Sequence, residues 1–253
     1  MKIFHPHGNV KIAIVKFFSN LISTIIFIFF CLLFPKINKK YNNIIISRAT
    51  YCPWKKNLKY LQIYKFISFL TLLDHPRLFT IFYFLNKIKH INADILDIGC
   101  MKGGIGIMSS MVTQNKNSRI FLFDTFSGFL EKDKLHTKKI FIYKGIDEIK
   151  KIIKELKFKN TYVLKRYFPN NIKDLDIKRI KFCHIDVNTL ISTINTYNFV
   201  KKKIVTNGII IFDDYGIVGL EKITKFIDYI SQRDKKEFHF IFNYFGQCIL
   251  IKK

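Results

Sequence analysis

Residues 94–106 read DILDIGCMKGGIG, in which a short apolar run gives way to a turn rich in glycine. The run 94–99 is typical of a buried strand, and residues 103–115 suit a helix that begins at the glycines. A strand, a tight glycine turn and a helix make up the first half of a βαβ unit. The stretch therefore predicts the start of an α/β sheet.

The alternation of predicted strands and helices continues through the rest of the sequence. We expect strands at 119–124, 161–166, 180–186 and 208–214, with helices at 147–156, 189–200 and 220–232. Residues 238–253 are typical of a hairpin that turns near residues 245–246. Repeated βα units form parallel sheets with right-handed crossovers. The expected fold is therefore α/β, a Rossmann-like doubly wound and mostly parallel sheet with a C-terminal antiparallel hairpin.

Upstream of this pattern the sequence predicts helices. Residues 51–90 carry apolar side chains near helical spacing, and Pro53 and Pro76 mark helix boundaries. We therefore divide the chain into an N-terminal apolar segment at 1–40, a helical cap at 41–90 and a Rossmann-like domain at 91–253.

Residues 17–34, FFSNLISTIIFIFFCLLF, hold no charged side chain over 18 positions. A membrane-spanning helix needs roughly 17–25 predominantly apolar residues, so this segment is long enough to span, to lie on the membrane or to pack on the domain. Lysines on both sides of it, most of them after Pro35, favour a cytoplasmic C-terminal side. We expect a cytoplasmic protein attached to the cytoplasmic face of a membrane through residues 17–34.

Composition narrows the class of partner. The 253 residues include 43 Lys+Arg against 18 Asp+Glu, a formal net charge of +25. Such a balance is typical of nucleic-acid binding, but the lysines are scattered among abundant Ile, Phe and Asn, which indicates compositional drift. The five cysteines are widely spaced without a CxxC pair, which argues against a disulfide framework or a structural zinc site. A homo-oligomer is compatible with these features.

The glycine turn indicates a ligand. A dinucleotide fingerprint has one residue between its first two glycines, whereas three residues separate Gly99 from Gly103 and Gly104. This wider turn suits S-adenosylmethionine, which has no pyrophosphate to hold. Asp124 ends the next strand, where an acid accepts hydrogen bonds from ribose hydroxyls. Alternatively, the glycines allow close packing and Asp124 caps a turn.

Acidic residues also end two later strands. His184 and Asp186 end one, and Asp213 and Asp214 end the next. The carboxyl ends of parallel strands face the ligand crevice, so the three aspartates should converge. Three oxygen ligands suit Mg²⁺ or Mn²⁺ better than zinc. His184 points to the same side of its strand as Asp186, as a base or as a structural histidine.

Eight stretches occur in order along residues 51–253: YCPWKK (51–56), TLLDHPRL (71–78), DILDIGCMKGGIG (94–106), FDTFSGF (123–129), YFP (167–169), HIDVN (184–188), FDDYG (212–216) and GQCILIKK (246–253). As an ordered set they resemble the macrocin O-methyltransferase (TylF-type) family of class I methyltransferases. The resemblance implies divalent-metal-dependent methyl transfer from S-adenosylmethionine to a sugar hydroxyl, with the metal on Asp186, Asp213 and Asp214. Asp97 stands where that family often has Glu, and Asn188 where it often has Asp.

We therefore predict an O-methyltransferase for a sugar or glycoconjugate. The alternatives are a nucleic-acid methyltransferase and an inactive membrane-attached homologue. Amino-methylating enzymes of nucleic acids usually carry an Asn/Asp-Pro-Pro-aromatic turn where this chain has HIDVN, and the intact aspartates argue against lost activity. The predicted site comprises Asp186 and His184 for catalysis, Asp186, Asp213 and Asp214 for the metal, and Asp97, Gly99, Gly103, Gly104 and Asp124 for S-adenosylmethionine.

Overall fold

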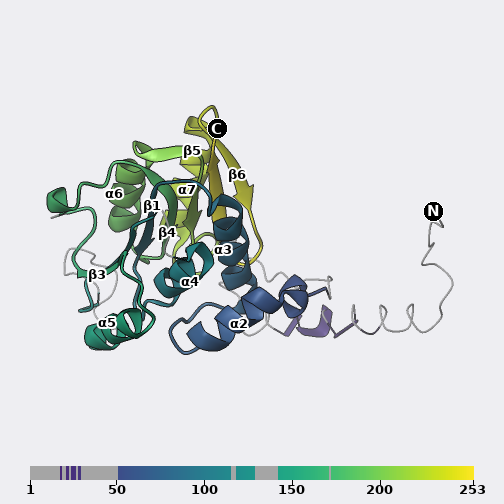
Figure 1. Cartoon of the computed structure of the whole chain (residues 1–253). Helices are drawn as coiled ribbons and strands as arrows, with labels where there is room; N and C mark the ends of the chain where they lie inside the picture. Colours follow the sequence, from purple (N-terminus) through teal and green to yellow (C-terminus); the bar gives the residue numbers. More distant parts are fainter. Residues whose placement is uncertain are drawn as a thin grey trace, which may run out of the picture. The chain divides into compact units, whose positions relative to one another are not determined.

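The computed structural model describes residues 18, 21–22, 24–26, 28–29, 51–114, 118–128, 142–170 and 172–253 (Figure 1). The chain forms two compact units, Met1–Cys52 and Pro53–Lys253. The described residues of the apolar segment 17–34 are helical, and the rest of that segment lies outside the described residues. Within the described part, none of the helices has the length and apolar character that a bilayer span requires. Membrane attachment through residues 17–34 stays a prediction.

The larger unit is built on one sheet, in which the described residues contribute seven strands in the order β3-β2-β1-β4-β5-β7-β6. The first five pair in parallel, β7 is antiparallel to β5, and β6 is antiparallel to β7. The predicted parallel sheet with a C-terminal antiparallel hairpin is thus confirmed. The strands are β1 (Asp94–Ile98), β2 (Ile120–Asp124), β3 (Thr161–Lys165), β4 (Ile180–Ile185), β5 (Ile204–Phe212), β6 (Phe238–Phe242) and β7 (Cys248–Lys252).

Helices cover both faces of this sheet (Figure 1). One apolar cluster joins a face of the sheet to α2, α3, α4 and α5, and a second joins the other face to α6 and α7. The doubly wound arrangement is therefore confirmed. The helices are η1 (Pro53–Lys56), α2 (Leu58–Ile67), α3 (His75–Ile88), α4 (Gly104–Thr113), α5 (Ile146–Glu155), η2 (Lys173–Leu175), α6 (Leu190–Lys201) and α7 (Glu221–Arg233).

The described part of the predicted cap, residues 51–90, contains two capped helices. The side chain of Asn57 accepts a hydrogen bond from the amide of Tyr60 at the start of α2, and Asp74 does the same for Arg77 at the start of α3. Both helices pack against α4 within one apolar cluster. They therefore belong to the same compact unit as the sheet.

Strand β5 begins earlier than its sequence indicates. The sequence predicts this strand at 208–214, whereas β5 begins at Ile204 and includes Asn207 and Gly208, a dipeptide typical of turns. Asn207 has a positive φ of 61°, and the pairing with β4 shifts register between Ile180 and Phe182. The turn-like dipeptide therefore forms an irregularity within a longer strand.

The order of the strands creates the ligand crevice. From β1 the chain proceeds to β2 and β3 on one side of the sheet and to β4 and β5 on the other. Ligands of open α/β sheets bind beyond the carboxyl ends of the strands at such a reversal. Gly99, which follows β1, lies against the end of β4: a Cβ atom at Gly99 would lie 1.8 Å from the carbonyl oxygen of Asp186.

We expect substitution of Gly99 to disrupt the fold far more than substitution of Gly216. Both glycines have positive φ, +85° and +76°, but a Cβ at Gly216 would have nothing within 4 Å. Gly216→Ala should cost only left-handed strain, about 1–2 kcal/mol, whereas Gly99→Ala must also displace the backbone of Asp186. Urea unfolding measures both variants. Equal midpoints for the two variants would show that the close approach of β1 and β4 is not needed.

Candidate active site

The turn after β1 is held by backbone hydrogen bonds. The amides of Gly99 and Cys100 donate to the carbonyl of Phe123 at 2.9 and 3.1 Å, and the amide of Gly103 donates to Cys100 at 2.7 Å. Gly99 and Gly103 both have positive φ. The glycines therefore allow the chain to reverse tightly between β1 and α4.

Asp97 lies beneath this turn and is 1% exposed. Its Oδ2 accepts a hydrogen bond from the amide of Gly106 at 3.1 Å, and its Oδ1 lies 3.0 Å from Nδ1 of His184. The carboxyl group thus joins β1, α4 and β4. These contacts give it a positioning role for the turn.

Asp124 is at the end of β2, where the sequence predicted an acid beside the turn. Its Oδ2 accepts from the amide of Met101 at 2.8 Å, and its Oδ1 accepts from the amide of Phe126 at 2.7 Å. Burial raises the pKa of Asp124, and the amide hydrogen bonds of Phe126 and Met101 oppose that shift. Each oxygen keeps a second lone pair, so the group can still accept a ligand hydroxyl.

A cavity of about 160 Å³ opens over the turn. One wall is the segment 70–73 between α2 and α3, which the amide of Gly104 anchors by donating to the carbonyl of Leu70 at 3.0 Å. The fit is close, because a Cβ at Gly104 would lie 2.6 Å from that carbonyl oxygen. The other lining segments are 97–102, 123–125, 166–168 and 186–188.

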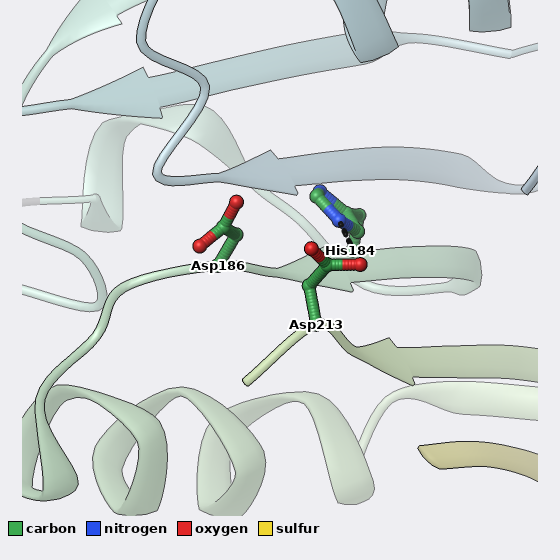
Figure 2. A group of neighbouring side chains, drawn as sticks. All are labelled: His184, Asp186 and Asp213. Carbon is green, nitrogen blue, oxygen red and sulfur yellow. Dashed lines mark ion pairs between the residues drawn. The ribbon is translucent and has the colours of Figure 1, made fainter. Parts of the chain in front are cut away.

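Figure 2 shows His184, Asp186 and Asp213 gathered at the ends of β4 and β5. One potential ligand atom of each lies within 4.8 Å of those of the other two. Both oxygens of Asp213 accept a hydrogen bond, Oδ1 from Nε2 of Gln247 at 2.6 Å and Oδ2 from Nη1 of Arg77 at 2.8 Å, and each keeps a second lone pair.

Asp214 is the remaining member of the predicted metal set and lies outside the group of three in Figure 2. Its Oδ2 accepts from the amide of Asn188 at 2.8 Å, and burial raises its pKa to about 6. The pKa of Asp186 is raised well above its usual range by burial and by the negative charges of Asp214 and Asp213. The three predicted carboxylates therefore act on one another at close range.

His184 is buried between two carboxylates. Its Nδ1 lies 3.0 Å from Asp97, and its Nε2 lies 3.8 Å from Oδ1 of Asp213. Burial by itself lowers the pKa of His184, but the nearby carboxylate of Asp213 and the hydrogen bond to Asp97 raise it to about 10. The two carboxylates therefore favour the charged imidazole. A charged imidazole has no lone pair with which to accept a proton or bind a metal.

The donor set fits a hard divalent cation. Four carboxyl groups, those of Asp97, Asp186, Asp213 and Asp214, meet two basic side chains, Arg77 and His184. The carboxyl groups outnumber the basic side chains, so negative charge is in excess when all of them are ionised. The metal-binding atoms of the carboxyl groups are oxygens, which Mg²⁺ and Mn²⁺ prefer. Buried carboxylates without sufficient counter-charge are costly, so a cation would relieve their repulsion.

Sequence reasoning assigned no role to Arg77, Gln247 or the segment 70–73. Arg77, Gln247 and residues 71–73 lie within the stretches TLLDHPRL and GQCILIKK, which carry the family resemblance. The ion pair of Arg77 with Asp213 joins positions 136 residues apart, so no local pattern could reveal it.

The doubly wound sheet, the wide glycine turn after β1, the acid after β2 and the antiparallel C-terminal hairpin together fit a class I methyltransferase fold. The model of the macrocin-O-methyltransferase (TylF) family matches residues 71–237, which is more than half of the chain. The chain belongs to this family, as its motifs predicted. It is therefore an S-adenosylmethionine-dependent O-methyltransferase.

Solved structures share the fold at low sequence identity. The O-methyltransferase NovP aligns with a TM-score of 0.63 and 15% identity over 73% of this chain and 82% of its own. The calicheamicin methyltransferase CalS11 gives 0.55 and 11% over 81% and 99%; another structure describes it as a TDP-rhamnose 3'-O-methyltransferase. An O-methyltransferase from Bacillus cereus in complex with SAH gives 0.51 and 12% over 78% and 92%. No curated protein sequence gives a significant match.

We expect Gly104→Ala to weaken binding of S-adenosylmethionine by about tenfold, equivalent to about 1.4 kcal/mol, while the sheet stays folded. The new methyl group would push Leu70 and the segment 70–73 away from the cavity. Calorimetric titration measures the affinity, and circular dichroism checks the fold. Gly219→Ala is the control outside the cavity lining: a Cβ there has open space, and the positive φ of +91° adds left-handed strain without a clash. Equal affinity in Gly104→Ala and wild type would show that the segment does not contact the cofactor.

Proposed function

We propose that this enzyme transfers the methyl group of S-adenosylmethionine to a hydroxyl of a sugar or glycoconjugate, assisted by Mg²⁺ or Mn²⁺. The observation that carries the proposal is the close group of His184, Asp186 and Asp213, in which Asp186 lines the cavity over the glycine turn; the charge of Asp214 also acts on Asp186. A sugar acceptor is supported by the likeness to CalS11, which is described as acting on TDP-rhamnose.

The cavity over the turn suits the cofactor. Gly99, Gly103 and Gly104 let the turn pack closely against Asp186, Ile149 and Leu70 around the cavity, and the carboxylate of Asp124 would accept hydrogen bonds from the ribose hydroxyls. Asp97 would fix the turn through its bonds to Gly106 and His184, since it is buried while Asp124 is partly exposed.

Methyl transfer needs no general acid to protonate the leaving group. An oxygen–carbon bond forms at the acceptor hydroxyl, the carbon–sulfur bond breaks, and the sulfonium leaves as a neutral thioether. The hydroxyl proton must go to a base or to water. The tasks left to the protein are therefore to orient the hydroxyl and to ease the loss of its proton.

A divalent cation in this site would supply the Lewis acidity that makes a hydroxyl easier to deprotonate. Asp186, Asp213 and Asp214 would hold it. Asp213 is oriented for this by Arg77 and Gln247, and Asp214 by the amide of Asn188.

Asp186 is the better proton acceptor of the two predicted catalytic residues. It lines the cavity, and burial together with the charges of Asp214 and Asp213 raises its pKa. His184 is charged and enclosed between Asp97 and Asp213, so its role in this proposal is to hold those two carboxylates in place.

Loss of one carboxylate should abolish most of the activity without abolishing cofactor binding. We expect Asp213→Asn to lower methyl transfer by roughly a hundredfold or more, because metal assistance contributes several kcal/mol to such steps. Excess chelator should have the same effect on wild type, reversed by added Mg²⁺. Asp147→Asn, at an exposed acid of α5, is the control. Full activity in chelator would contradict the metal role.

The acceptor class has its own test. Cell extract incubated with the enzyme and methyl-labelled S-adenosylmethionine is separated into saccharide, RNA and protein fractions. We expect the label in the saccharide fraction as a methyl ether that resists alkali. Label that accumulates in RNA would instead support the nucleic-acid alternative and contradict this proposal.

A further inference from the structure

Arg77 reaches the carboxylate cluster from outside the sheet. It lies in the first turn of α3, and its Nη1 donates to Oδ2 of Asp213 at 2.8 Å. The side chain of Asp213 is 1% exposed, whereas that of Arg77 is 23% exposed. A fixed positive charge is thus held at the inner edge of the proposed metal site.

Two different donors hold the two oxygens of Asp213. Arg77 supplies a charged donor to Oδ2, and Gln247 supplies a neutral amide donor to Oδ1 at 2.6 Å. Both can orient the carboxylate, but only Arg77 changes the charge of the cluster. Orientation and charge can therefore be separated by substitution.

The charge of Arg77 acts on more than its direct partner. It lowers the pKa of Asp186 and of Asp214, against the larger opposing effects of burial and of neighbouring carboxylates. In the described residues, His184 is the other basic side chain that acts on both groups. Charges in a buried cluster are weakly screened, so Arg77 must also act on any cation that binds there.

We propose that Arg77 sets the affinity of this site for divalent cations by supplying part of the counter-charge that the three aspartates require. The inference rests on the metal role proposed above. Arg77 holds the carboxylates together when no cation is bound and repels the cation when one is present. The enzyme thereby keeps a folded site while binding the metal exchangeably.

The competing interpretation is that Arg77 only ties α3 to the sheet. The two interpretations predict opposite changes in the affinity for Mn²⁺ when Arg77 is replaced. If Arg77 supplies counter-charge, Arg77→Met should bind Mn²⁺ more tightly than wild type, by about tenfold, which is a typical coupling between interacting sites. If Arg77 only orients Asp213, its loss should weaken binding.

The stability of the protein gives an independent readout. Without Arg77 the metal-free cluster carries more uncompensated negative charge, so the melting temperature of metal-free Arg77→Met should fall. Because a ligand stabilises the state that binds it, added Mn²⁺ should raise the melting temperature of the variant more than that of wild type.

Titration calorimetry with Mn²⁺ and thermal unfolding with and without Mn²⁺ test the proposal on the full chain. Arg77→Lys keeps the charge and should bind within about threefold of wild type, well inside the expected coupling. Gln247→Met removes the neutral donor without changing charge and should not bind more tightly. Arg77→Gln replaces Arg77→Met if the latter shows no cooperative unfolding.

The outcomes separate this inference from the proposed function. Weaker or unchanged Mn²⁺ binding in Arg77→Met and Arg77→Gln, relative to wild type, overturns the role of Arg77, even where wild type binds Mn²⁺. Binding by Arg77→Met but not by wild type supports that role and overturns the metal role in the native enzyme. Absence of binding in every variant overturns both.

Discussion

Repulsion between carboxylates is the constraint on which this structure depends. Asp186 follows β4 and Asp213 and Asp214 follow β5, neighbouring strands of a parallel sheet, so their negative charges converge in a buried crevice. Such a cluster needs compensating positive charge, or else one of its carboxyl groups keeps a proton. Arg77 and His184 supply part of it, each through contact with Asp213. The remaining deficit is what makes the site a candidate for a divalent cation and, through it, for O-methyl transfer.

The backbone around this cluster brings the turn after β1 close to the acidic side chains. The lack of a side chain at Gly99 lets the turn after β1 touch the end of β4, which places the cofactor cavity directly beside the acids. Asp97 then bonds to both α4 and His184, so the turn and the charge cluster are connected by one carboxyl group. The proposed cofactor site and the proposed metal site are thus parts of a single arrangement at the carboxyl edge of the sheet.

The alternation of strands and helices, the glycine turn and the acids at strand ends were all predictable, because each depends on residues close together in the sequence. The pairing of Arg77 and Gln247 with Asp213 was not, since it depends on how α3 and β7 pack against β5. The contact of His184 with Asp97, which favours the charged imidazole, could not be predicted from the local sequence either, because the two residues are 87 positions apart. Asn207 and Gly208 form a dipeptide that is typical of turns, yet both residues lie within strand β5.

A crystal structure of the full enzyme with S-adenosylhomocysteine and Mn²⁺, recorded with anomalous diffraction, tests the central claim most directly. The account predicts an anomalous peak bound by carboxylate oxygens of Asp186, Asp213 and Asp214, with the ribose hydroxyls of the ligand on Asp124. A structure with S-adenosylhomocysteine in the cavity over Gly99 but no ion at these carboxylates, at saturating Mn²⁺, would contradict it.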